Sequence, residues 1–387
     1  MMNTCPVTGT VVVVCPGGLE NGGGIGRMMG YFLHADRGLD PRLVYRIIDS
    51  RGPWFLGASP LRTILAVGYL AGSLLNLLAI RVSNPRCIAH INITGRGSTV
   101  RKAVFCGFAR LIGLPYLLHL HDADYASDYS RRGALAKWVV RSVFQHAETV
   151  IVLGERDGKL VPEALRLPVG QVTILHNAVP DPNPKDSEQP QRVGEGHILF
   201  LGHLSARKGV PDLLQALASP ALQGQAWRAT LAGGGPIEEY RDMATRFGIA
   251  DRVTFPGWVD EAAVKALFAD AEILVLPSYA EGLAMSVLEG LSHGMAVVAT
   301  PVGAHAEVIE TEVSGILVAP GNIDELADAL RRIIADPNLQ GRLRAGARAR
   351  FLEKFDVRGY AERLSRIHRT VLSDNSNHRT HAARQTS

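Results

Sequence analysis

The chain of 387 residues has only four cysteines, Cys5, Cys15, Cys87 and Cys106, and they are scattered along the sequence. This spacing suits neither a zinc cluster nor a disulfide framework, so we expect reduced thiols in a cytosolic protein. Aromatic residues make up only 6% of the chain and do not alternate with the basic residues. No nucleic-acid-binding motif is present either, so the sequence argues against nucleic acid as a partner.

Acidic residues are missing between Asp49 and Asp122. The charged residues in this interval are Arg51, Arg62, Arg81, Arg86, Arg96, Arg101, Lys102 and Arg110. Two interpretations fit: an ordinary solvated basic face, or attraction to anionic lipid headgroups or to a phosphate-bearing acceptor. Under the second interpretation we expect Arg96, Arg101 and Lys102 to contact the acceptor or an anionic membrane.

Long uncharged runs are scarce as well. The segment 63–80 has no charge and lies between Arg62 and Arg81, but it is at the lower length limit for a membrane span and contains Gly, Ser and Asn. We therefore expect a buried crossover helix here. The first apolar run, Val11–Val14, is too short for a secretory signal, so a buried first strand is the better interpretation.

Apolar runs alternate with amphipathic ones along the whole chain, a pattern typical of parallel α/β architecture. The length exceeds the usual limit of a single core and predicts two domains. Predicted strands of the first half are 11–14, 87–93, 116–120, 150–153 and 172–175. Those of the second half are 197–201, 229–231, 253–255, 273–276, 296–299 and 315–318.

The proline-rich segment 180–190 can sustain neither helix nor strand and predicts an interdomain linker. We assign domains to 1–185 and 193–355, a last helix to 356–372 and a disordered tail to 373–387. A helix is also predicted over 131–146, with Leu135, Trp138, Val139 and Val143 in an apolar stripe. We expect this stripe to pack in the core, with docking to a membrane as the alternative.

The most informative motif is Glu281-Gly282 followed by Glu289. A predicted strand, Ile273–Leu276, runs into a loop that carries Glu281, and the following apolar run predicts a helix that contains Glu289. Free N–H groups at the start of such a helix form an anion site. An acidic loop, an anion-binding turn and a second acid suit a sugar attached to a nucleoside diphosphate.

This motif resembles the Glu-x7-Glu signature of retaining glycosyltransferases with the GT-B fold, particularly family 4. The resemblance implies an α/β GT-B fold, in which two facing Rossmann-like doubly wound domains enclose an interdomain cleft. It also implies a final helix that crosses back to the first domain. Carried over to this chain, Glu289 holds the ribose diol and Glu281 lies against the donor sugar.

Gly202–Gly209 resembles the family segment Gly-Arg-Leu-x-x-x-Lys-Gly, whose Arg and Lys neutralise the donor diphosphate. Lys208 takes the lysine role, and His203 stands where the Arg is expected, with Arg207 as a candidate substitute. The loop 17–27 misses a dinucleotide fingerprint, but in the family it lies between the donor phosphates and the acceptor, which implicates Gly23 and Gly24.

Other segments resemble the walls of the nucleotide pocket. The residues implied to bind the donor are Gly23, Gly24, His203, Arg207, Lys208, Gly234, Trp258, Val259, Glu281, Gly282, Leu283, Ala284 and Glu289. For Trp258, core packing is the alternative to a contact with the base. The residues implied in catalysis are His121, Lys208 and Glu281.

His121 ends a predicted strand and resembles the family histidine that faces the transferred sugar and the acceptor, with a structural strand-end role as the alternative. His119 is interpreted as structural. The Asp122-Ala123-Asp124 triplet spells a metal-binding Asp-x-Asp, but its place after the strand resembles a family 4 segment instead. We expect no metal and no other cofactor.

These features predict a retaining, metal-independent hexosyltransferase that uses a UDP- or GDP-sugar donor. The acceptor is expected to be a saccharide or lipid-linked saccharide of bacterial surface or exopolysaccharide assembly. We expect a cytoplasmic location, either free or peripheral on the cytoplasmic face of the inner membrane. The alternatives are a sugar-nucleotide epimerase on the same fold and a non-catalytic scaffold that binds nucleotide-sugars.

Overall fold

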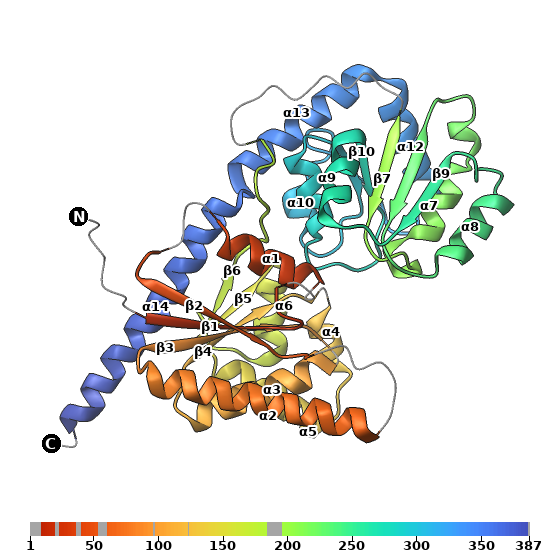
Figure 1. Ribbon diagram of the computed structural model, residues 1–387. Coiled ribbons are helices and arrows are strands. Elements are labelled where there is room, and N and C mark those ends of the chain that lie inside the picture. The colour runs from red at the N-terminus through yellow and green to blue at the C-terminus, as the bar shows by residue number, and fades with distance from the viewer. Residues whose placement is uncertain are drawn as a thin grey trace. The chain divides into compact units, whose positions relative to one another are not determined.

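The structure is a computed structural model that describes residues 9–19, 23–35, 40–52, 60–95, 97–122, 124–183 and 196–385. It divides into two compact units. Unit 1 comprises Met1–Asn177 and Val357–Ser387, and unit 2 comprises Ala178–Asp356. Each unit contains a six-stranded parallel sheet with helices on its faces, so the α/β class predicted from the sequence is confirmed (Figure 1).

The strands of unit 1 are β1 (Gly9–Cys15), β2 (Leu43–Asp49), β3 (Cys87–Ile93), β4 (Tyr116–Leu120), β5 (Thr149–Val152) and β6 (Val172–Ile174). Its helices are α1 (Gly23–Leu33), α2 (Pro60–Ser83), α3 (Gly97–Leu111), α4 (Tyr125–Ser130), α5 (Ala134–Gln145), α6 (Glu155–Leu165) and α14 (Val357–Gln385). The sheet order is β2-β1-β3-β4-β5-β6, so the strand order reverses between β1 and β3. This is the flavodoxin-like order, in which ligands bind outside the carboxyl ends of the strands at the reversal.

The two faces of the unit 1 sheet carry different helices. Val12 and Val14 of β1 join a core cluster with residues of α2, α3, α5 and α6. Val11 and Val13 point to the opposite face, because successive strand side chains alternate. That face carries α1 and α14, which pack against each other (Figure 1). Helix α14 also packs against β1 and β3.

Helix α14 continues to Gln385, whereas a disordered tail was predicted from Ser373. After Gly359 the segment contains neither Gly nor Pro, so no residue breaks the backbone hydrogen-bond pattern. Its first half is anchored on unit 1 by the buried residues Tyr360, Leu364 and His368. Polar composition alone therefore misjudged this segment.

The helix predicted at 63–80 is present as α2, between the parallel strands β2 and β3, but the prediction that it is buried is wrong. Helix α2 is the one helix of the described residues that is long and apolar enough to cross a membrane, yet only 17% of its most apolar window is buried in the structure. A similar correction applies to α5, where Val143 is buried but Leu135 and Trp138 are exposed. An apolar stripe was read as core in both cases.

The strands of unit 2 are β7 (His197–Leu201), β8 (Arg228–Ala232), β9 (Val253–Gly257), β10 (Ile273–Leu276), β11 (Ala296–Ala299) and β12 (Ile316–Leu317). Its helices are α7 (Val210–Leu217), α8 (Ile237–Arg246), α9 (Glu261–Asp270), α10 (Met285–Ser292), α11 (His305–Val308), α12 (Ile323–Ala335) and α13 (Pro337–Lys354), with 3₁₀ turns η1 (Ala206–Lys208) and η2 (Pro220–Leu222). The sheet order β9-β8-β7-β10-β11-β12 is that of a dinucleotide-binding Rossmann sheet. The strand order reverses between β7 and β10.

The start of unit 2 lies earlier than the sequence suggested. Residues 178–183 were assigned to the first domain, but the Val179 N–H donates to the carbonyl of Phe355 at 3.0 Å. Asp181 forms an ion pair with Arg348 at 2.8 Å. These contacts hold the segment on the last part of unit 2, and most of the predicted linker, 184–190, lies outside the described residues.

Candidate functional site

The loops that follow β7 and β10 lie next to each other at the strand-order reversal of unit 2. The Tyr279 N–H donates to the carbonyl of Arg207 at 2.9 Å, and Arg207 Nη1 donates to the carbonyl of Ala280 at 2.5 Å. Gly209 has φ 70°, and a Cβ there would lie 2.1 Å from the carbonyl oxygen of Pro277. Only glycine permits this approach, which brings the two predicted donor segments together.

Lys208 and Glu281 form an ion pair between Nζ and Oε1 at this point, with both side chains largely buried. Arg207 Nη1 lies 3.9 Å from the same carboxylate oxygen, but its side chain is mainly exposed. Lys208 is therefore the cation placed directly on Glu281, and Arg207 is a second, more exposed charge beside it.

Glu289 lies on α10, one turn after its first residue, and is only 6% exposed. Glu289 is therefore not an ordinary solvated surface glutamate. Every residue of α10 is buried. The helix begins directly after Leu283 and Ala284, so its first N–H groups face the end of the Glu281 loop, where the helix dipole favours an anion.

His305 was missed by sequence reasoning and supports this loop. Its Nε2 accepts the N–H of Ala284 at 3.3 Å, and its Nδ1–H donates to the carbonyl of Thr300 at 3.0 Å. Burial lowers the pKa of His305, which keeps the imidazole in the neutral form that can accept the Ala284 hydrogen bond. Nothing in the local sequence signals this role, because it depends on a contact across the fold.

Gly303 completes the support. Its φ is 57°, and a Cβ would lie 2.0 Å from the carbonyl oxygen of Glu281 and 2.2 Å from that of Gly282. The adjacent Ala304 N–H donates to the Gly282 carbonyl at 2.8 Å. Backbone contacts from Gly303 and Ala304 therefore fix the acidic loop, so the position of Glu281 is preorganised.

The remaining predicted donor residues of unit 2 lie at the same end of the sheet. Gly234 and the exposed His203 follow β8 and β7, and the Leu204 N–H donates to the Gly234 carbonyl at 2.8 Å. Trp258 and Val259 follow β9. Trp258 is 79% exposed, so the alternative of core packing is wrong and its indole face is open to a ligand.

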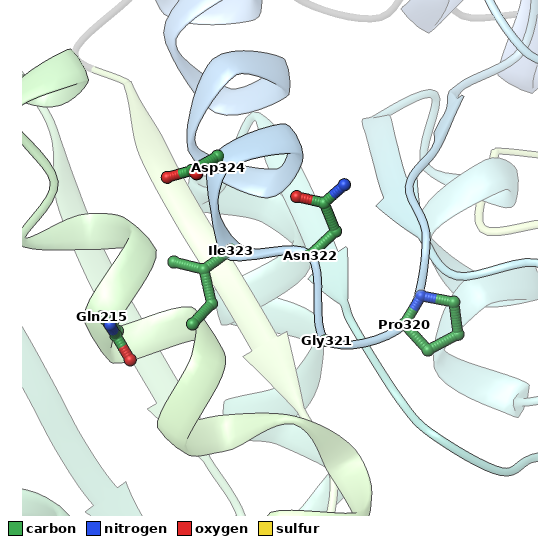
Figure 2. Close-up of a pocket in the computed structure, with 6 residues that line it drawn as sticks. All are labelled: Gln215, Pro320, Gly321, Asn322, Ile323 and Asp324. Carbon is green, nitrogen blue, oxygen red and sulfur yellow. The ribbon is translucent and has the colours of Figure 1, made fainter.

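A hollow of about 500 Å³ also lies in unit 2, lined by Gln215 of α7 and by the segment 320–324 at the start of α12 (Figure 2). It shares no residue with the Lys208–Glu281 pair. Gly321 at its wall lies close to Tyr279, whose hydroxyl donates to Asp212 Oδ2 at 2.7 Å. We assign no ligand to this hollow.

In unit 1, Gly23 and Gly24 form the exposed start of α1. In the described part of the preceding loop, Gly17 is held by Asp49, whose Oδ1 accepts the Gly17 N–H at 2.6 Å and the Arg51 N–H at 2.8 Å. Asp49 was not singled out in the sequence. Its place at the end of β2, beside the end of β1, explains why it can organise the glycine loop.

His121 follows β4 and has a defined tautomer. Its Nε2–H donates to Asn92 Oδ1 at 2.8 Å, and Asn92 Nδ2 in turn donates to the carbonyl of Val14 at 3.3 Å. Burial lowers the pKa of His121 to about 3. The imidazole is therefore neutral at pH 7, with the lone pair on Nδ1 able to accept a hydrogen bond.

Behind His121 lies a buried chain of imidazoles. His368 of α14, His90 of β3 and His119 of β4 are joined by Nε2···Nδ1 hydrogen bonds of 3.0 and 3.2 Å. The Tyr45 hydroxyl lies 3.3 Å from His368 Nδ1, and the centroids of the His119 and His121 rings are 4.1 Å apart, with the rings tilted by 33°. All three side chains are fully buried, so the structural interpretation of His119 fits the geometry.

The two carboxylates of the Asp-x-Asp triplet, Asp122 and Asp124, contact neighbouring protein groups. Asp122 Oδ2 accepts the Gly95 N–H at 2.5 Å, and Asp124 Oδ1 pairs with Arg156 at 3.2 Å. Within the described part of the chain, no group of three His, Cys, Asp or Glu residues could hold a metal ion. Asp122 and Asp124 therefore serve the local loop in this structure.

The three basic residues selected for an acceptor or membrane differ in their positions. Arg96 lies outside the described residues, and Arg101 is half-buried on α3. Lys102 is 1% exposed and bonds through Nζ to the Ser50 hydroxyl, so its assignment as a surface contact is wrong. It lies on the side of α3 that faces the sheet, and burial lowers its pKa to about 7.

A Rossmann-type sheet with a fixed acidic loop and a largely buried cation at its strand-order reversal places the candidate site where nucleotide-binding α/β proteins hold their ligands. Residues 183–350 match the family model for glycosyl transferases group 1. The chain is 27% identical to α-D-kanosaminyltransferase of Streptomyces kanamyceticus, over 79% of this chain and 84% of that one. It is 25% identical to the lipopolysaccharide core biosynthesis mannosyltransferase LpcC of Rhizobium leguminosarum bv. viciae, over 63% and 70%.

Among solved structures, the chain resembles Anabaena Alr3699/HepE in complex with UDP-glucose, with a TM-score of 0.70 and 19% identity. The match covers 92% of this chain and 98% of that one. The chain is thus similar to glycosyltransferases of group 1, whose family model matches most of unit 2, and it has the GT-B fold that the sequence predicted.

Proposed function

We propose that this glycosyltransferase is a retaining, metal-independent member of family 4. It transfers a hexose from a UDP- or GDP-sugar to the hydroxyl of a lipid-linked saccharide in the assembly of a bacterial surface polysaccharide. The observation that carries the proposal is the Lys208–Glu281 pair, held by backbone contacts at the strand-order reversal of unit 2 and followed by the start of α10.

In this proposal Lys208 stabilises the charge that develops on the departing diphosphate, with Arg207 as a second cation. The N–H groups at the start of α10 add positive potential from the backbone without requiring a metal. Because Lys208 is already paired with Glu281, binding of the donor exchanges part of this contact for contacts to phosphate. Glu281 then lies against the donor sugar and Glu289 accepts hydrogen bonds from the ribose diol.

His121 contributes its neutral imidazole. The Asn92 contact holds the Nε2–H tautomer, so Nδ1 is available to accept a hydrogen bond from a sugar or acceptor hydroxyl. A histidine with so low a pKa is a weak base, which fits a positioning contact better than full proton removal. This agrees with departure of the diphosphate assisting attack by the acceptor on the same face of the sugar.

The donor and acceptor classes have separate support. HepE was solved with UDP-glucose, which supports a nucleoside diphosphate sugar as donor. The lipopolysaccharide role in the name of LpcC supports a saccharide acceptor on a lipid. The absence of acidic residues between Asp49 and Asp122 supports attraction of an anionic lipid carrier, and with it a peripheral position on the cytoplasmic face of the inner membrane.

The test is to incubate the protein with UDP- and GDP-sugars and a lipid-linked saccharide, and to measure release of the nucleoside diphosphate. Proton NMR of the new glycosidic bond should show the anomeric configuration of the donor. Activity should persist in excess EDTA. An inverted anomer would reject the retaining mechanism, and loss of activity in EDTA with rescue by Mn²⁺ would reject metal independence.

The same assay separates the two alternatives. An epimerase would convert the nucleotide-sugar or its sugar without needing an acceptor, whereas a scaffold would bind the donor and release nothing. The exposed His203 in place of the expected Arg is the one feature that favours the scaffold. Release that requires an acceptor would exclude both alternatives.

A further inference from the structure

Unit 1 exposes an unusual number of large apolar side chains on one side. They come from three helices that cover the same face of the sheet. We call this set the apolar face; it consists of Ile64, Leu65, Val67, Leu75 and Val82 of α2, Val100, Val104 and Leu111 of α3, and Leu135 and Trp138 of α5. Exposed apolar groups are normal when single, but a cluster of this kind indicates an interaction site.

Helix α2 shows the feature most clearly. Its inner side contacts the core through Leu77 and Ile80, with Ser73 also buried. Its outer side presents Ile64, Leu75 and Val82, and no charged residue lies between 63 and 80. A surface helix normally carries charged residues opposite its buried stripe, and a helix that is apolar all round is found in a core or in a membrane.

The three helices form one surface. Helix α3 packs against α5, and Arg110 Nη1 donates to the Ser142 hydroxyl at 3.1 Å. Arg81 near the end of α2 donates from Nη2 to the carbonyl of Gly113, just after α3, at 3.0 Å. All three lie along the same side of the unit 1 sheet (Figure 1). The apolar side chains therefore belong to one face rather than to three separate sites.

The charged residues of these three helices all have the same sign. By sequence, α2, α3 and α5 contain no Asp or Glu. Arg86 and Arg110 are exposed, and Arg81, Arg101 and Lys137 are partly exposed. Apolar side chains framed by Lys and Arg, with a Trp that is 67% exposed, are the composition of a helix surface that lies in a membrane interface.

We propose that the apolar face docks unit 1 onto an anionic phospholipid bilayer, with α2 lying in the plane of the interface. Helix α2 does not span the bilayer, because Leu77 and Ile80 keep its inner side packed on the sheet. The basic side chains reach the headgroups while their aliphatic stems lie along the apolar surface. A second copy of the chain is a poor occupant, since it would bring two basic faces together.

This inference deepens the proposed use of a lipid-linked acceptor, but it can be tested without any transfer reaction. The protein is sedimented with vesicles of phosphatidylcholine alone and of phosphatidylcholine with phosphatidylglycerol. We expect binding to the anionic vesicles, weaker binding to the neutral ones, and loss of binding as added salt shortens the Debye length from about 10 Å at 0.1 M to about 3 Å at 1 M.

The decisive variant is Ile64→Gln/Leu75→Gln/Val82→Gln, which removes exposed apolar groups from α2. We expect it to bind anionic vesicles at least tenfold less tightly. The matched control is Phe247→Gln/Val313→Gln/Leu352→Gln, which removes three exposed apolar groups from unit 2 and should bind like the wild type. Thermal unfolding of both variants checks that they are folded.

A charge variant tests the second part of the proposal. Arg86→Gln and Arg101→Gln should each weaken binding to anionic vesicles by about fivefold, the effect expected for one basic residue near an anionic surface. Binding to vesicles of phosphatidylcholine alone should not change. Equal binding to both kinds of vesicle would show that the basic residues are not involved and would overturn the anionic assignment.

Three other results would overturn the proposal. If the wild type fails to bind anionic vesicles, the face has no affinity for a bilayer, whatever the outcome of the transfer assay. If bound protein resists extraction at alkaline pH, α2 spans the membrane. If analytical ultracentrifugation shows a wild-type dimer that the α2 variant loses, the apolar face is an interface between two copies.

Discussion

Both units are built on a six-stranded parallel sheet, but the polar groups at their sheets differ in charge. Unit 2 places an ion pair, Lys208–Glu281, at its strand-order reversal. Unit 1 instead buries neutral imidazoles, with His90 and His119 fully enclosed and His121 at the strand end. A parallel sheet fixes where a site can form, because its loops gather at the carboxyl ends of the strands. The residues at those ends decide whether the site handles charge or hydrogen bonds.

The comparison predicts that unit 2 carries most of the electrostatic catalysis. Lys208→Ala should lower turnover by about 10²–10³-fold, the range seen when one preorganised charge-stabilising group is removed. Release of nucleoside diphosphate measures the effect. Arg207→Ala is the control, and it should cost much less because the Arg207 side chain is mainly exposed. A larger loss with Arg207→Ala would place the main diphosphate cation at Arg207.

In unit 1 the buried imidazoles should matter for stability. His90→Phe leaves His119 Nδ1 and His368 Nε2 without their partner in the fully buried chain, which should lower the free energy of unfolding by about 2–4 kcal/mol. Denaturant unfolding gives this value. The exposed His146→Phe is the control and should change it by about 0.5 kcal/mol or less. Equal effects would mean that the chain contributes no stability.

Substitutions of Glu289 test whether unit 2 also binds the nucleoside part of the donor. Glu289→Ala should weaken binding of UDP or GDP by about 1.5–3 kcal/mol, the range for a hydrogen bond to a charged group. Isothermal titration calorimetry measures the affinity. Glu289→Gln, which keeps the volume of the buried side chain, separates the lost charge from a packing defect. Unchanged affinity in both folded variants would reject the ribose assignment.

Lowering the pH should destabilise unit 1 more than unit 2. Burial lowers the pKa of His368 to about 3 from an ordinary value near 6.5, so the folded state resists protonation more than the unfolded state. Its contribution to stability is complete above pH 6.5 and is lost as the pH falls toward 3. At pH 5 the loss is about 2 kcal/mol for this one group.

Hydrogen exchange followed from pH 7 to pH 5 should therefore show loss of protection in unit 1, including α14, before unit 2. His368→Leu should reduce the pH dependence of unit 1 stability, although it lowers the stability at pH 7. If both units lose protection together at the same pH, the imidazole chain is not the source of acid sensitivity.

Local sequence predicted the strands that are buried on both faces. β3, β4, β7 and β10 appear with the bounds read from their apolar runs. Strand β2 was missed because it lies at the edge of the sheet, where Arg46 is exposed and the apolar run is interrupted. The motif around Glu281 and Glu289 could also be recognised from the sequence, because its loop, its helix start and its second acid follow one another along the chain.

The sequence by itself determined the α/β class, the resemblance to a glycosyltransferase family and the two donor segments around Lys208 and Glu281, because each depends on residues that are near in sequence or on a repeating pattern. The contact between those two segments came from the tertiary structure. Only the tertiary structure decided which apolar and basic side chains face solvent. Lys102 and Arg101 are neighbours in the chain, yet one is buried and the other is partly exposed. Likewise, α2 has the composition of a core helix, but the core has room for only one side of it, so its outer side stays exposed. Periodicity shows that a helix has faces, whereas only packing shows what covers them.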